Sequence, residues 1–401
     1  MKVLPRSSHP ISRKCISRHA LDVMYRLTRK GHRALLVGGG VRDLLISREP
    51  NAFDIATSAR PYTVRKLFRN SIVIGRRFKL VHVLFGKQFV EVATFRKYSE
   101  YTEENANSTF GNPRDDAFCR DFTVNSLFYD IRNFNVIDYT GGLKDIAGQK
   151  VRIIGDPQER LEEDPVRMIR GARLAAQIDF TIDDGTFSSM QKNAALLQDA
   201  SESRLSYEIR KTFQCGNTSG GVRYLYEAGL LKQIFPHLDA DLRKAGRKTE
   251  QDVWHCLSEL DRLSDEDGFT PSFVLVSATL LMPLLLHSVP DFWNSKYPVY
   301  KLCDNIRSHI SRWIRGVKIN AGERSKIAEI FTIQRRFAFV NTKNFSRRKF
   351  IRTDYFRDAL DLFRIYTLHS RRWQEIPDIW DKARCSRLEL KDLKHEINRV
   401  K

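Results

Sequence analysis

A glycine-rich turn followed by an acidic strand is the first feature of the sequence that could do chemistry. The residues GGG at 38–40 run into VRDLLIS, where backbone N–H groups at a helix start could approach a phosphate. The run has neither the GxGxxG spacing of dinucleotide-binding turns nor the GxxxxGK[ST] spacing of P-loops, so alone it predicts only a tight turn. In the next strand, AFDIAT, positions 52 and 54 share a face while Phe53 faces the core. Paired carboxylates there would clamp divalent ions against a nucleotide triphosphate, but only Asp54 is acidic and position 52 is Ala52.

A second carboxylate lies in another apolar strand. Glu91 stands between Val90 and Val92 in QFVEVATF, which alternates as a strand does. An unpaired carboxylate in a central strand is costly, so Glu91 indicates a site. The alternative is that Glu91 lies on a solvent-exposed face of the strand and belongs to no site.

Two further motifs combine acids with arginines. In CRDFTVNSLFYD, Arg120 could hold phosphate, and Asp121 could hold a metal ion or a ribose hydroxyl. In EEDPVRMIRGAR, the pattern predicts Asp164 as an N-cap, a helix from Pro165, and Arg167 on the same helix face. An acceptor beside a guanidinium could read the Watson–Crick edge of a base. A capped helix with a surface ion pair is the alternative.

Regular elements position these residues. We expect a helix over 16–31, with its buried face at Ile16, Ala20, Leu21, Met24 and Leu27. Strands in ALLVGGG, AFDIAT, SIVIG, KLVHVLFG and QFVEVATF, with a helix from Pro61, predict an α/β unit to about residue 150. From Asp164 onward the spacing predicts helices.

Charge and composition narrow the partners. The 401-residue chain carries a formal net charge of +20, and +13 of it falls in residues 301–401. This asymmetry favours a nucleic-acid partner over a generally basic surface. Six scattered cysteines indicate a reducing cytoplasm, where the thiols are small core side chains. No apolar run reaches about 18 residues and no apolar segment follows the N-terminus, so we expect no membrane span and no secretory signal.

The ordered motifs GGxVRD, the DxD strand, RRDFTxNA and EDPxRxxRxxR resemble those of the class II nucleotidyltransferases. That superfamily contains bacterial poly(A) polymerase and the CCA-adding enzymes. The four motifs span residues 38–173. HPISRKCISRHALDVMYRL, IVIGRRFKLVHV with Phe78 and His82, and FTIQRRF with FRDALDLFRIY resemble the polyadenylating subgroup. The resemblance covers about residues 9–370.

The resemblance implies a fold, a reaction and a set of site residues. It implies an α+β fold, in which a polymerase-β-like nucleotidyltransferase head with a mixed sheet precedes all-α neck, body and RNA-binding domains. We expect boundaries at 1–30 for an N-terminal helical extension, 31–155 for the head, 156–240 for the neck, and 241–401 for the body with its basic C-terminal region. The implied reaction is template-independent attack of an RNA 3′-hydroxyl on the α-phosphate of ATP, with Mg²⁺ required. We expect RNA 3′ ends and ATP as partners, a monomer, and a cytoplasmic location.

Specific roles follow from the resemblance. Asp54 would be a catalytic metal ligand, with Glu91 or Asp121 completing the acidic set. Asp164 and Arg167 would read the base of the nucleotide, with Arg170 nearby. The nucleotide would be held by residues from three of the motifs: Gly38, Gly39, Arg42, Arg120, Asn125, Asp164, Arg167 and Arg170. RNA would be bound by Arg335, Arg336, Arg347, Arg348 and Lys349. Interleaved aromatics could stack bases, but burial as helix core is equally compatible with the spacing of Phe337, Phe356 and Phe363.

Three positions depart from the family pattern. Ala52 replaces the first DxD carboxylate, Cys119 replaces the first arginine of RRDFT, and Ser126 follows Asn125 where the family has alanine. A methyl group cannot ligate metal, so we predict a strongly impaired enzyme. Ala52 has three interpretations. It is an engineered substitution, or a natural loss that leaves an RNA-binding protein without catalysis, or a change for which flanking acids compensate. Addition of CCA to tRNA is the alternative activity.

Overall fold

The computed structural model describes residues 1–75, 79–97, 110–294, 296–315, 318–339, 346–385 and 390–400. Arg76, Arg77 and Phe78 of the predicted subgroup signature lie outside these ranges. The chain forms two compact units. Unit 1 comprises residues 1–163 and 179–189, and unit 2 comprises residues 164–178 and 190–401. The finer four-part division stays a prediction.

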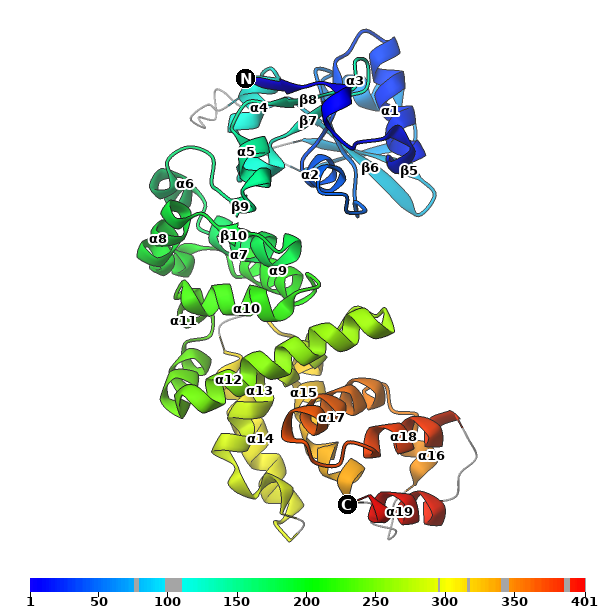
Figure 1. Ribbon diagram of the computed structural model, residues 1–401, viewed down its shortest axis with the longest axis vertical. Coiled ribbons are helices and arrows are strands. Elements are labelled where there is room, and N and C mark those ends of the chain that lie inside the picture. The colour runs from blue at the N-terminus through cyan, green and yellow to red at the C-terminus, as the bar shows by residue number, and fades with distance from the viewer. Residues whose placement is uncertain are drawn as a thin grey trace. The chain divides into compact units, whose positions relative to one another are not determined.

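Unit 1 is built on one mixed sheet of eight strands, in the order β1-β8-β7-β2-β3-β6-β5-β4. Strands β5, β6, β7 and β8 of this sheet are labelled in Figure 1. Only β3 and β6 pair in parallel; the other neighbours are antiparallel. The strands are β1 Lys2–Leu4, β2 Ala34–Val37, β3 Asp54–Thr57, β4 Ser71–Ile74, β5 Leu80–Phe85, β6 Gln88–Thr94, β7 Phe128–Asp130 and β8 Asn135–Asp138. A second, two-stranded sheet pairs β9 Lys150–Val151 with β10 Thr181–Ile182.

Helices cover the larger sheet unequally. One face carries the larger apolar cluster, which includes Met24 of α1 and Val64 of α3. The other carries a smaller cluster, which includes Ala56 of β3 and Ala117 of α4. The helices up to the end of this unit are α1 Arg18–Arg29, α2 Gly39–Leu45, α3 Pro61–Leu67, α4 Pro113–Phe118, α5 Gly142–Ala147, α6 Pro157–Glu163 and α8 Asp184–Asn193.

Helix α1 follows the predicted amphipathic pattern. Ala20, Met24 and Leu27 are fully buried against the sheet, and Ile16 is buried just before the helix begins. Apolar residues at this spacing form one stripe on a helix, and burying that stripe fixes the helix on the sheet.

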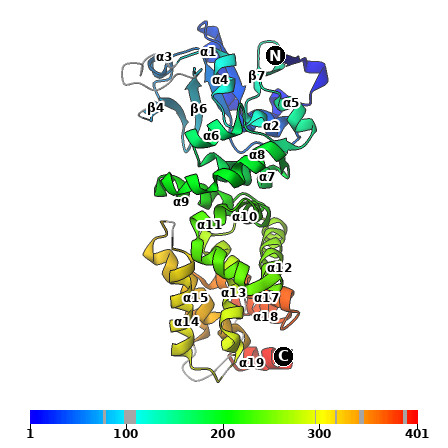
Figure 2. The same ribbon diagram turned by 90° about the vertical axis from the view of Figure 1, so that its left-hand side faces the viewer.

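Within its described residues, unit 2 contains helices and no strand (Figure 2). They are α7 Arg167–Ile178, α9 Glu202–Phe213, α10 Thr218–Glu227, α11 Leu230–Ile234, α12 Pro236–Asp267, α13 Phe273–Ser288, α14 Val299–Trp313, α15 Ala321–Ala338, α16 Arg347–Ile351, α17 Phe356–Ser370, α18 Ile376–Cys385 and α19 Leu390–Arg399. Helix α13 is apolar on every side and buried from Phe273 to Leu285, so it is the core of the unit. No helix in the described ranges is long and apolar enough to cross a membrane. A mixed sheet followed by helices confirms the predicted fold class.

Aromatic residues of the C-terminal part form a packed core. Phe337, Phe356 and Phe363 are at most 2% exposed. The Phe337 ring lies 5.8 Å from Phe356, 5.3 Å from Phe363 and 5.5 Å from Trp380. Of the two interpretations that the spacing allowed, burial is confirmed for these three residues.

Candidate functional site

The turn between β2 and α2 brings an acid and an arginine to one point. Gly38 has φ +73°, and a Cβ there would lie 3.5 Å from Nη1 of Arg120 and 3.7 Å from Oδ2 of Asp54. Val37 and Asp54 are partners across the β2–β3 pair, which fixes the carboxylate beside the turn. The absence of a side chain at Gly38 leaves the space between these two charged groups open.

The structure corrects the position of Ala52. Strand β3 begins at Asp54, so Ala52 is exposed and lies in the segment before the strand rather than within it as predicted. Its carbonyl oxygen would be 3.0 Å from a Cβ on Gly40. The close approach of this segment to α2 therefore depends on glycine at position 40.

Glu91 lies next to Asp54 in the sheet. Ile55 pairs in parallel with Val92, so the residues before them, Asp54 and Glu91, occupy adjacent positions on neighbouring strands and face the same side. The side chain of Glu91 is one-third exposed, and its Oε2 lies 3.2 Å from Nε2 of His82 on β5. Two carboxylates thus share the less covered face of the sheet.

A buried acid positions Arg120. Asp116 on α4 is inaccessible to solvent, and it accepts hydrogen bonds from Nε and Nη2 of Arg120 at 3.1 and 2.7 Å. It also accepts one from Nε of Arg96 at 3.1 Å. Burial alone would raise the pKa of Asp116, but attraction by Arg120 and Arg96, with their hydrogen bonds, leaves that pKa below its usual value. An ionised Asp116 therefore holds Arg120 in place.

Arg42 and Asn125 lie beside the same turn. Arg42 is buried, donates from Nη1 to Oδ1 of Asn125 at 2.5 Å, and donates from Nη2 to Asp43 at 2.7 Å. Its guanidinium would be in ordinary contact, at 3.4 Å, with a Cβ on Gly39. Asp121 is half-buried, and its carbonyl accepts from the N–H of Ile154 at 3.1 Å.

The carboxylates fit a magnesium ion that also binds substrate. Asp54 and Glu91 offer the hard oxygen ligands that Mg²⁺ takes, and one or two protein carboxylates with substrate phosphates are a common set. No group of three or more His, Cys, Asp and Glu side chains within the described ranges could hold a metal ion unaided. Phosphate oxygens of a substrate would complete the ligands that these two carboxylates begin.

Unit 2 contains a separate cluster of ion pairs around the start of α7. Oδ2 of Asp164 lies 2.8 Å from Nη2 of Arg204 on α9 and 3.9 Å from Nη2 of Arg170. The buried Glu208 pairs with Nε of Arg170 at 3.0 Å and with Nη2 of Arg173 at 3.3 Å. Arg170 therefore bridges the two acids and joins α7 to α9.

The helix that carries Arg167 begins later than predicted. Helix α7 starts at Arg167 rather than at Pro165, and the N–H of Arg167 donates to the carbonyl of Asp164 at 3.1 Å. Asp164 thus lies in the turn before the helix, where its Oδ1 accepts from the N–H of Val166 at 3.3 Å. Arg167 itself is buried.

The predicted RNA-binding residues have different surroundings. Arg336, Arg348 and Lys349 are exposed, whereas the side chain of Arg347 lies outside the described residues. Arg335 is buried and donates to the carbonyls of Tyr297 and Asn294 at 3.0 and 2.6 Å. This placement favours a structural role for Arg335 over the RNA contact predicted for it.

Sequence reasoning missed the residues that hold the site residues in place. Asp116 stands four residues before Arg120, and this i,i+4 spacing is a signal that the sequence does contain. Arg204 and Glu208 have no such signal, because they meet Asp164 and Arg170 only through the packing of two helices.

Comparison with known proteins identifies two regions of the chain. Residues 34–152 match the family model described as the poly A polymerase head domain. Residues 179–242 match the one described as the probable RNA and SrmB-binding site of polymerase A.

Relatives of two named activities are similar to the chain. Poly(A) polymerase I of Salmonella typhi is 41% identical over 300 residues, which cover 71% of this chain and 64% of that protein. The CCA-adding enzyme of Bacillus pumilus is 32% identical over 265 residues, which cover 62% of this chain and 64% of that enzyme. The match therefore spans less than two thirds of each relative.

Solved structures share the fold. The CCA-adding enzyme of Bacillus stearothermophilus, solved with CTP, superposes with a TM-score of 0.63 at 22% identity, over 96% of this chain and 81% of that one. A tRNA nucleotidyltransferase with a primer tRNA and an incoming ATP analogue gives a TM-score of 0.62 at 19% identity, over 90% and 98% of the two chains.

Proposed function

The chain belongs to the nucleotidyltransferase family of the poly(A) polymerases and CCA-adding enzymes, and from this premise we propose that it adds AMP from ATP to RNA 3′ ends without a template. The higher identity to poly(A) polymerase I, 41% against 32%, supports this activity over CCA addition. The observation that carries the proposal is the meeting of Gly38, Asp54 and Arg120 at one turn.

The proposed roles in unit 1 follow from charge. Asp54 and Glu91 would hold magnesium, which would supply a Lewis acid for phosphoryl transfer; Asp121 is the alternative second acid. Arg120, held by Asp116, is placed to offset negative charge on a phosphate next to Gly38. Such preorganised donors stabilise the charge that develops during transfer.

The remaining nucleotide-binding residues have proposed roles of two kinds. Gly39, Arg42 and Asn125 would bind sugar and phosphate. Asp164, Arg167 and Arg170 would select the base: a carboxylate accepts from an exocyclic amine, and guanidinium groups donate to ring nitrogens and carbonyls.

Nucleotide addition to two RNA substrates tests the activity. The chain and its Ala52→Asp variant would each be incubated with Mg²⁺, with ATP or CTP, and with either an oligoadenylate or a tRNA that lacks CCA. Extension of the oligoadenylate by ATP alone, stronger in the variant, is expected. CTP incorporation into the tRNA would instead establish the CCA-adding activity.

Binding of RNA without catalysis is the second candidate, and Ala52 favours it because a methyl group cannot ligate a metal ion. Under that function, RNA affinity would fall steeply with salt while turnover of Mg-ATP stays absent even in the Ala52→Asp variant. We further propose that the protein acts as a cytoplasmic monomer, with the head at 31–155, the neck at 156–240 and the body at 241–401.

A further inference from the structure

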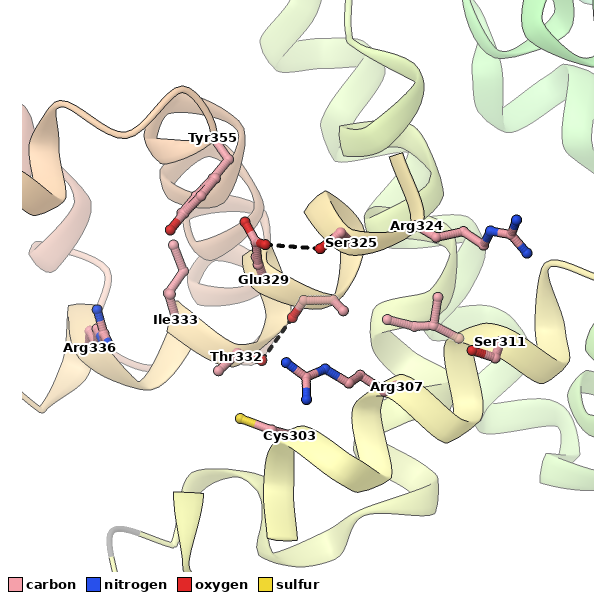
Figure 3. Close-up of a pocket in the computed structure, with 12 residues that line it drawn as sticks. Cys303, Arg307, Ser311, Arg324, Ser325, Glu329, Thr332, Ile333, Arg336 and Tyr355 are labelled. Atoms are coloured by element: carbon pink, nitrogen blue, oxygen red, sulfur yellow. Dashed lines mark hydrogen bonds between the residues drawn. The ribbon is translucent and has the colours of Figure 1, made fainter. Parts of the chain in front are cut away.

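A pocket of about 430 Å³ lies between α14 and α15, and Tyr355 closes one side (Figure 3). We refer to it as the α14–α15 pocket. Its volume falls in the range that holds small-molecule ligands or one nucleotide. It is lined by Cys303, Arg307, Ile310, Ser311, Arg324, Ser325, Ala328, Glu329, Thr332, Ile333, Arg336 and Tyr355. None of these residues belongs to the segment that matches the RNA-binding family model.

The pocket contains three exposed arginines. Arg307, Arg324 and Arg336 are exposed, and none of them pairs with a carboxylate of the described residues. Other arginines of unit 2 do form such pairs: Arg210, Arg243, Arg262, Arg312, Arg357 and Arg364. Glu329 is the one acid among the lining residues, and it accepts from the hydroxyl of Ser325 at 3.0 Å. Positive charge in the pocket therefore exceeds negative charge.

The arginines are spread along the pocket rather than gathered at one end. Arg324 and Arg336 both line the pocket and are twelve residues apart on α15, which places their Cα atoms about 18 Å apart along the helix axis. Figure 3 shows Arg307 extending from α14 toward Thr332, between these two ends. A row of cations of this length matches an extended polyanion better than a single phosphate.

The row continues onto the next helix. The guanidinium of Arg336 lies 6.0 Å from the ring centre of Phe350 on α16. Arg348 and Lys349, on the same short helix, are exposed. Exposed positive charge therefore extends from the pocket toward residues 348–349.

We propose that the α14–α15 pocket binds a single-stranded segment of the RNA substrate, with Arg307, Arg324 and Arg336 on successive phosphates. This inference rests on the proposed function, and it adds an RNA subsite outside the matched RNA-binding segment. The hydroxyl of Ser311 can donate to a phosphate or ribose oxygen. Tyr355 offers an aromatic ring for a base, and stacking of this kind is independent of sequence. An acidic protein segment would use the arginines but not this ring.

Binding of a labelled oligoadenylate to the full chain tests the proposal. We would measure affinity across a salt series for the wild type and for a variant with Arg307→Ala, Arg324→Ala and Arg336→Ala. The three side chains are exposed, so the variant should fold, and its thermal unfolding midpoint checks this. Loss of three phosphate contacts should weaken binding about tenfold or more and lower the slope of log affinity against log salt by about 2. Arg315→Ala, an exposed arginine just after α14 that does not line the pocket, is the matched control.

The outcomes separate this inference from the proposed function. Unchanged affinity and slope in the triple variant would overturn the inference, even if the Ala52→Asp variant extends RNA. If that variant adds no nucleotide while RNA binding still depends on the three arginines, the proposed activity fails and the subsite stands. Displacement of the RNA by polyglutamate as readily as by unlabelled oligoadenylate would assign the pocket to an acidic protein partner and overturn the proposal.

Discussion

Asp116 accepts two hydrogen bonds from the guanidinium of Arg120, one turn further along the chain, and solvent reaches none of its surface. Asp116 does not itself react; it acts through Arg120. It fixes where the positive charge of Arg120 lies relative to Gly38 and Asp54. The position of the arginine next to the candidate phosphate site therefore depends on a residue that no substrate touches.

Asp116→Asn should reduce both stability and nucleotide addition. The amide cannot neutralise Arg120 and Arg96, and breaking a buried ion pair costs about 3 kcal/mol. Since the folded-state pKa of Asp116 is lowered, its stabilisation is present above about pH 4 and disappears as pH falls through that pKa. Chemical denaturation at several pH values measures the loss of stability. The KM for ATP in the Ala52→Asp background measures the effect on nucleotide addition.

Asp130→Asn is the matched control for Asp116→Asn. Asp130 is also buried and pairs with Arg132 at 2.7 Å, but it lies on β7 and is not among the site residues. It should lose stability without a change in the KM for ATP. Equal effects of the two variants on KM would contradict a positioning role for Asp116.

Ala52→Asp should increase AMP incorporation. A second carboxylate beside Asp54 would add a metal ligand, and several kcal/mol of transition-state stabilisation corresponds to about 100-fold or more in rate. Initial rates of oligoadenylate extension measure the change. Asn51→Asp adds the same charge one residue earlier, and a similar increase in that variant would show that general charge, not metal ligation, is responsible.

Gly38→Ala should impair activity in two ways, by straining the backbone and by placing a methyl group in the candidate phosphate site. At φ +73° a non-glycine residue is strained by about 1 to 3 kcal/mol, and the new methyl group would fill the space between Arg120 and Asp54. Gly31 has φ +82° but no neighbour within 4 Å of an added Cβ, so Gly31→Ala carries backbone strain without the crowding. Comparable stability loss in both, with activity lost only in Gly38→Ala, is expected. Activity lost to the same degree in both would refute the role of the open space.

Local pattern predicted much of unit 1, because its elements carry clear periodicity. The stripe of α1 and the alternation in β6 are both visible in the sequence, and the structure contains both. The apolar pattern at residues 52–53 predicts a start of β3 two residues before the observed one at Asp54, whereas the backbone of these residues follows the approach to Gly40. That approach is a tertiary contact, which periodicity does not encode.

The sequence pattern does not distinguish buried from exposed charged residues in unit 2. Arg335 and Arg336 are neighbours in the sequence, yet one is buried against the carbonyls of Asn294 and Tyr297 and the other is exposed. A basic pair on a helix does not reveal which member faces the core. Likewise Asp164 pairs with Arg204, forty residues away, and only helix packing brings them together.

Asp164→Asn should weaken discrimination between ATP and CTP. The variant replaces a carboxylate acceptor by an amide that also donates, and a lost or mismatched hydrogen bond to a base changes the specificity ratio about tenfold or more. The ratio of kcat/KM for the two nucleotides in the Ala52→Asp background measures it. Glu202→Gln, an exposed acid at the start of α9, controls for loss of charge. An unchanged ratio in Asp164→Asn would remove this residue from base selection.

Asp361→Asn should flatten the dependence of stability on pH. Burial raises the pKa of Asp361 to about 6, despite its ion pair with Arg357. The folded state therefore holds a proton that the unfolded state releases near pH 4, so stability is highest below that value and decreases as pH rises through about 6. The wild type should lose about 2 kcal/mol between pH 4 and 7.5 from this group, and the variant should lose less. Denaturation of both across this range measures the difference, with Asp304→Asn on α14 as an exposed control; parallel curves for wild type and Asp361→Asn would rule out a proton on Asp361.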